Sequence, residues 1–109
     1  MKVIAHKPQD IKDVSEWLNT SQDKLHLSLS SESISPFLPQ ILEMEDSFDE
    51  FPRDRKRTDK IVKLLRSGKP ALPIYVEKGD FSNFMKGRHR MTAFYLVGMK
   101  TILVCRVSK

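Results

Sequence analysis

Three glycines, Gly68, Gly87 and Gly98, divide the second half of the 109-residue sequence into short segments, and this spacing constrains the fold more than any other feature. Residues 54–67 carry apolar side chains on one side and many Lys and Arg on the other, which predicts an amphipathic helix that ends at Gly68. Residues 88–97 repeat apolar side chains at helical spacing up to Gly98. Gly87 then lies immediately before the second helix.

The segments between these helices are typical of strands. Residues 72–77 and 101–107 are rich in β-branched and aromatic side chains. A hairpin partner for the first of them is expected to begin at Phe81 or Asn83 and to end at Lys86. The order helix, strand, strand, helix, strand predicts a small α/β (α+β) domain with a short mixed sheet and packed helices.

The first half gives a weaker pattern, which predicts a helical and extended region. A short strand is expected at residues 2–6, and a helix at residues 9–19. Leu25, Leu27 and Leu29 alternate with polar residues and predict an extended segment. The serine-rich residues 28–35 predict a loop, and residues 37–44 a short helix.

Three aromatic residues are expected in the core. Trp17 lies on the apolar side of the first predicted helix, and Tyr75 and Phe81 occupy strand segments. Stacking on a nucleobase is the alternative for Tyr75 and Phe81.

The net charge of +5 conceals two halves of opposite sign. Residues 1–52 contain four Lys and ten acidic residues, a net charge of −6, whereas residues 53–109 carry +11. We expect residues 53–109 to form the core, with the acidic region packed on it or appended to it. The basic half indicates an anionic partner, and the acidic half screens it, packs beside it, or covers it until a partner arrives.

Cysteine usage and hydropathy favour a cytoplasmic protein. The single cysteine, Cys105, excludes an intramolecular disulfide. No apolar run is long enough to span a membrane, and the first residues do not resemble a secretory signal. His6 and His26 lack metal-ligand spacing, so no metal site is predicted.

The segment 86–90, Lys-Gly-Arg-His-Arg, is the strongest candidate site. A strand followed by glycine and a helix N-terminus is a phosphate-binding geometry, because free N–H groups of the first helical turn point at the anion. Arg88, His89 and Arg90 add side-chain donors, although positive charge there opposes the helix dipole. A solvated basic turn is the alternative interpretation.

The second half resembles the ParB/sulfiredoxin superfamily. The resemblance rests on residues 72–76 (Leu-Pro-Ile-Tyr-Val), 87–93 (Gly-Arg-His-Arg-Met-Thr-Ala) and 96–102 (Leu-Val-Gly-Met-Lys-Thr-Ile), in the order and spacing of that superfamily. It covers about half of the chain and leaves residues 1–52 unexplained. It implies a ParB-like domain that binds a nucleotide or phosphate. If the ligand is a nucleotide, the implied cofactor is a nucleoside triphosphate with Mg²⁺.

The resemblance implies binding roles for some residues and argues against the known catalytic chemistry of the superfamily at others. Sulfiredoxins carry their nucleophilic cysteine where this chain has Arg88, so sulfiredoxin chemistry is not expected. ParB proteins carry a glutamate there, so a metal-dependent hydrolytic role for this position is also in doubt. The helix-turn-helix module of ParB proteins has no counterpart before Lys109. The implied phosphate- or nucleotide-binding residues are Gly87, Arg88, His89, Arg90, Thr92, Arg57 and Lys60.

A basic helix precedes the turn. Its cations recur at spacings that share a helix face, which favours contact with a polyanion over an isolated solvated charge. The expected nucleic-acid-binding residues are Arg53, Arg55, Lys56, Lys63 and Lys86.

Three functions are consistent with these residues. The first is a nucleotide- or phosphate-binding protein that acts on or with nucleic acid. The second is a ParB-like nuclease or nucleotide hydrolase, for which no catalytic residue can be named. The third is a non-catalytic interaction or inhibitor protein of a mobile element that contacts a protein partner through residues 1–52.

Overall fold

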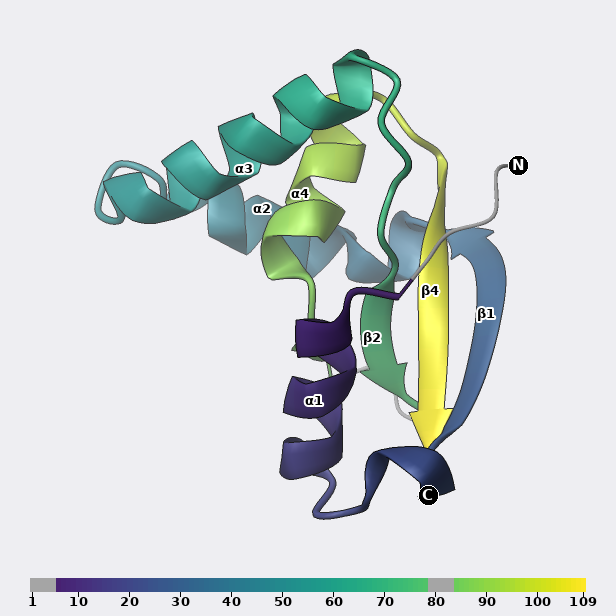
Figure 1. Ribbon diagram of the computed structural model, residues 1–109. Coiled ribbons are helices and arrows are strands. Elements are labelled where there is room, and N and C mark those ends of the chain that lie inside the picture. The colour runs from purple at the N-terminus through teal and green to yellow at the C-terminus, as the bar shows by residue number, and fades with distance from the viewer. Residues whose placement is uncertain (1–5, 79–83) are drawn as a thin grey trace.

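The computed structural model describes residues 6–78 and 84–109, which form a mixed sheet covered by helices (Figure 1). The strands are β1 (His26–Ser33), β2 (Ile74–Glu77), β3 (Phe84–Lys86) and β4 (Thr101–Ser108). Their order in the sheet is β1-β4-β2-β3. β4 pairs antiparallel with β1 and parallel with β2, and β2 pairs antiparallel with β3. The predicted α+β fold with a short mixed sheet is confirmed.

The helices begin and end at residues that favour such boundaries. They are α1 (Pro8–Trp17), α2 (Leu38–Asp46), α3 (Pro52–Arg66) and α4 (Arg88–Leu96). Proline occupies one of the first two positions of α1, α2 and α3, where its missing N–H has no intrahelical acceptor. Gly68 and Gly98 follow α3 and α4 with φ of +84°, as expected for helix-ending glycines. None of the helices in the described ranges has the length and apolar character needed to span a bilayer.

Two hydrophobic clusters lie on opposite faces of the sheet, because neighbouring residues of a strand point to opposite sides. Ile74, Val76 and Val104 belong to one cluster, and Tyr75 and Cys105 to the other. Residues of α2 and α4 complete the first cluster, and residues of α1 complete the second. Figure 1 shows α2, α3 and α4 as a group, with α1 apart from them. The sheet is therefore covered on both faces.

The predicted loop at residues 28–35 is wrong. Residues 28–33 belong to β1, which pairs with β4 in continuous register from His26↔Ser108 to Ser33↔Thr101. β1 is an edge strand whose side chains are mostly exposed. The ladder uses backbone groups that serine supplies as well as valine does, so the serine composition does not report the pairing.

The prediction for Trp17 is also wrong. Trp17 is the last residue of α1 and is 56% exposed, because Val14 and Leu18 form the buried side of this segment. Tyr75 is fully buried, as predicted. Phe81, and residues 2–5 of the first strand predicted at residues 2–6, lie outside the described residues.

An ion pair joins β1 to its neighbouring strand, β4. The Glu32 carboxylate accepts hydrogen bonds from Arg106 Nε at 3.1 Å and Nη2 at 2.6 Å. These bonds hold the pKa of Glu32 below its ordinary value of 4.5. A carboxyl whose pKa falls on folding stabilises the fold above its unfolded pKa, and this contribution is lost as pH falls through the folded pKa.

We therefore expect Glu32→Gln to lower the free energy of unfolding by about 0.5–1 kcal/mol at pH 7, because the pair is partly exposed. At pH 3 the variant and the wild type should differ less. Urea unfolding followed by circular dichroism at both pH values measures this. An equal difference at pH 7 and pH 3 would contradict it.

Candidate functional site

The candidate site is built around Gly87, which joins β3 directly to α4. Gly87 has φ of +107°, in the region that L-residues with side chains rarely adopt. A Cβ atom at this position would lie 2.9 Å from Ile74 Cγ2 and 3.1 Å from Ile74 Cα. Glycine thus allows the start of α4 to lie directly on β2, and the first N–H groups of α4 lack intrahelical acceptors.

A groove of about 600 Å³ opens beside this turn. Among the described residues that line it there is no carboxylate, and apart from Gly87 and two apolar side chains of α3 they are all basic. They are Lys7, Arg57, Lys60, Ile61, Leu64, Lys86, Gly87, Arg88, His89 and Arg90. The structure therefore brings together six of the seven residues predicted to bind phosphate or nucleotide.

Thr92 is the seventh, and it does not line the groove. It is fully buried, and its hydroxyl donates to the Arg88 carbonyl at 2.9 Å within α4. The apolar spacing of residues 88–97 did not indicate that the Thr92 side chain faces the interior.

Two of the basic side chains are already paired with α1. The Arg90 guanidinium lies 2.8 Å from Asp10 Oδ2 and donates to Asp10 Oδ1 and to the Pro73 carbonyl, both at 3.1 Å. Lys86 lies 3.4 Å from Asp10 Oδ1 and forms an ion pair with Asp13, which lowers the pKa of the Asp13 carboxyl. Asp10 is only 1% exposed. Arg90 and Lys86 therefore anchor α1 beside the groove.

Four other cations are available to a ligand. Lys7, Arg57, Lys60 and Arg88 are exposed, and within the described part of the chain none has a carboxylate within ion-pair distance. They come from the segment before α1, from α3 and from α4. These three elements thus surround the groove with unpaired positive charge.

His89 has a different partner, which the sequence did not reveal. Its Nε2 lies 2.8 Å from Asp54 Oδ1, so the first turns of α3 and α4 are joined by this pair. The hydrogen bond to His89 lowers the pKa of Asp54, and the nearby charges of His89, Arg88 and Arg57 act in the same direction. Asp54 stands between Arg53 and Arg55. An isolated acidic residue in a basic segment was the one sequence signal that could have indicated a special role for Asp54.

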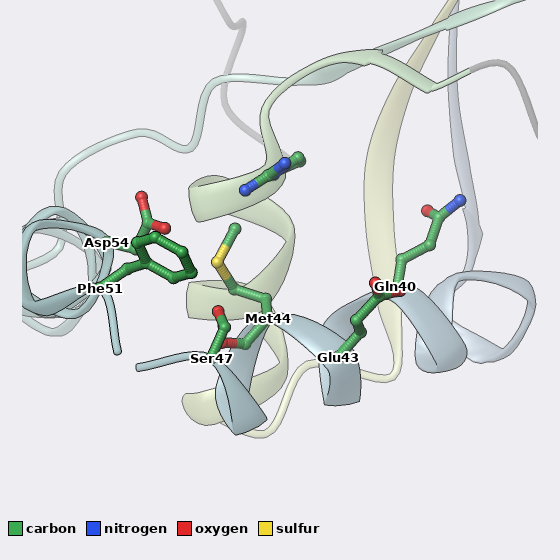
Figure 2. A pocket seen from close by; sticks show the side chains of 7 residues that line it. Gln40, Glu43, Met44, Ser47, Phe51 and Asp54 are labelled. Atoms are coloured by element: carbon green, nitrogen blue, oxygen red, sulfur yellow. The ribbon is translucent and has the colours of Figure 1, made fainter. Parts of the chain in front are cut away.

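A second pocket of about 590 Å³ shares Arg88 with the groove. Figure 2 shows Met44 and Phe51 approaching each other, with Asp54 beside Phe51 and with Glu43 and Gln40 farther along α2. Phe51 is 55% exposed. The wall between the two hollows includes Arg88 and the Asp54–His89 pair, since His89 lines one and Asp54 lines the other.

The remaining predicted nucleic-acid-binding residues lie on α3 outside the groove. They are all exposed: Arg53, Arg55, Lys56 and Lys63. Lys56 and Lys63 flank Arg57 and Lys60 along the helix, so positive charge continues beyond the groove.

Other chemistry is limited by burial. Cys105 is fully buried, and burial raises the pKa of its thiol to about 11. A nucleophilic thiolate is therefore not supplied at this position near neutral pH. Among residues 6–78 and 84–109, no group of three His, Cys, Asp or Glu side chains could hold a metal ion.

No family model, no curated protein and no solved structure matches this chain.

Proposed function

We propose that the protein binds the phosphodiester backbone of a single-stranded nucleic acid along the groove and the adjoining face of α3. The observation that carries the proposal is a groove of about 600 Å³ at the N-terminus of α4, where the lining residues that the structure describes include seven basic residues and no carboxylate. A phosphate beside Gly87 would meet the N–H groups of α4 and the Arg88 guanidinium. This is also the ligand class that a ParB-like domain would imply.

An extended anion suits the charge distribution better than a compact one. Arg57 and Lys60 line the groove, and Lys56 and Lys63 continue along α3. A chain of phosphates could contact these positions in succession. Each neutralised phosphate releases counterions, and the affinity then falls steeply with salt.

Lys60→Gln and Arg88→Gln are each expected to weaken binding of a fluorescent single-stranded oligonucleotide roughly three- to tenfold, and to reduce the slope of log Kd against log salt by about one. Fluorescence anisotropy between low and physiological salt measures both quantities. Lys24→Gln is the matched control, because exposed Lys24 does not line the groove. Binding that does not respond to salt would contradict the proposal.

A mononucleotide is the second candidate ligand, favoured by the exposed Phe51 ring in the pocket that shares Arg88 with the groove. We propose that its base stacks on Phe51 while its phosphates contact Arg88. Stacking contributes about 1–3 kcal/mol, so Phe51→Ala should weaken nucleotide binding at least about fivefold. Isothermal titration with CTP and with ATP, each with Mg²⁺, tests this. No heat with either nucleotide would exclude it.

A further inference from the structure

His89 and Asp54 form a pair that could do more than join two helices. Each contributes to a different hollow, and Arg88 borders both. The His89 side chain is 23% exposed, so solvent can reach it, and its Nε2 lies 2.8 Å from Asp54 Oδ1. The pair therefore stands beside the place where the proposed function puts a phosphate.

The hydrogen bond determines which imidazole nitrogen can accept a proton. Asp54 has a lowered pKa and is ionised near neutral pH, so its carboxylate can only accept a hydrogen bond. Nε2 must then carry the proton in the neutral imidazole, and Nδ1 keeps its lone pair. Within the described ranges Nδ1 has no hydrogen-bond partner. A histidine oriented by a carboxylate, with its other nitrogen free, is the arrangement of a general base.

The surrounding charges suit the same chemistry. Arg88, Arg57 and Lys60 line the groove together with His89. Negative charge accumulates on the phosphoryl oxygens during hydrolysis, and fixed cations beside the helix N-terminus would stabilise it.

We propose that His89 is a catalytic general base for hydrolysis of a phosphodiester bond in the bound nucleic acid, and that Asp54 is its positioning residue. This inference rests on the proposed function. Nδ1 of His89 takes a proton from a water molecule while the water oxygen bonds to phosphorus. The phosphorus–oxygen bond to the leaving group breaks, and the leaving oxygen keeps the electron pair and takes a proton from solvent. His89 returns its proton to solvent, so one water is consumed for each bond broken.

The test uses the full chain with end-labelled single-stranded DNA and RNA of the same sequence, and it measures binding and cleavage separately. His89→Gln should reduce the cleavage rate about 100-fold or more while the Kd from anisotropy changes less than about threefold. His26→Gln, on exposed β1, is the matched control and should cleave like the wild type. Wild-type cleavage of both nucleic acids is expected, because attacking water needs no 2′-hydroxyl.

Asp54 needs a readout that a purely structural role would not change. Asp54→Asn should lower kcat about tenfold or more with little change in KM, and Asp54→Glu should restore part of the loss. The imidazole ¹⁵N shifts of His89 should report the Nε2–H tautomer in the wild type and a mixture in Asp54→Asn. Asp59→Asn, exposed on the same helix, is the charge-matched control. The ¹⁵N measurement also applies if His89→Gln fails to fold.

Each remaining outcome has a defined consequence. Binding without cleavage by the wild type overturns the catalytic inference and leaves the proposed function intact. Equal cleavage by the wild type and His89→Gln assigns the activity to another residue or to a contaminant and also overturns it. Cleavage of RNA alone, leaving 2′,3′-cyclic phosphate, overturns attack by water. Failure of both nucleic acids to bind overturns the proposed function as well.

Discussion

Gly87→Ala is expected to lower the free energy of unfolding by roughly 2–5 kcal/mol, combining a left-handed backbone penalty of about 1–2 kcal/mol with overpacking of about 1–3 kcal/mol. The overpacking arises because the added Cβ would lie 2.9 Å from Ile74 Cγ2 and 3.1 Å from Ile74 Cα. Ile74 is fully buried in β2, so it has little room to move. Urea unfolding followed by circular dichroism measures the change.

Gly98→Ala is the matched control for the backbone term. Gly98 also adopts the left-handed conformation, with φ of +84°, but a Cβ atom added there would have no described residue within 4 Å apart from its chain neighbours. It should cost only about 1 kcal/mol. Equal destabilisation by the two substitutions would mean that the added Cβ atom at position 87 does not overpack Ile74. That result would contradict the close contact between the start of α4 and β2. The oligonucleotide affinity of folded Gly87→Ala should fall too, since the same contact sets the start of α4.

Asp10→Ala is expected to destabilise the protein by about 3–5 kcal/mol, because removing one member of a buried ion pair leaves the other charge uncompensated. Asp10 is 1% exposed and the Arg90 side chain 13%. Without Asp10, Arg90 keeps the Pro73 carbonyl but has no countercharge on α1. The loss should be visible in thermal and urea unfolding at pH 7.

Asp13→Ala is the control for this prediction. Asp13 lies on the same helix and pairs with Lys86, but its side chain is 23% exposed, so its loss should matter far less. The double variant Asp10→Ala with Arg90→Met should recover part of the lost stability, because an apolar side chain does not require a countercharge. An Asp10→Ala variant as stable as Asp13→Ala would show that the buried pair does not hold α1 in place.

The elements of the second half could be predicted because local rules and the fold agree there. Gly68 and Gly98 end helices, and Val62, Met91 and Phe94 are buried as the apolar spacing predicted, whereas Leu64 and Tyr95 are exposed. The groove was also predictable in outline, since Arg57, Lys60 and residues 87–90 were all expected to bind phosphate. The first half was harder. β1 carries serines on an exposed edge, and Trp17 follows the apolar spacing of α1 yet lies in solvent.

Partners distant in sequence could not be predicted, because spacing along a chain gives no information about them. Asp10 meets Arg90 across 80 positions, and Asp54 meets His89 across 35. The opposite net charges of the two halves indicated that they attract each other, but not which residues would meet. Only these pairs determine which charged side chains stabilise the fold and which remain available to a ligand.

The position of β4 has a consequence for the order in which the fold can form. β4 lies between β1 and β2 in the sheet but follows both in the sequence. During synthesis, β1 is complete about 70 residues before its only neighbouring strand in the described sheet emerges from the ribosome. The closure of such a distant contact is slow, since the entropy of the intervening chain must be lost first. Until then the leucines of β1 stay unpaired, and the serines and Glu32 of the same strand keep its free edge polar and less prone to aggregate.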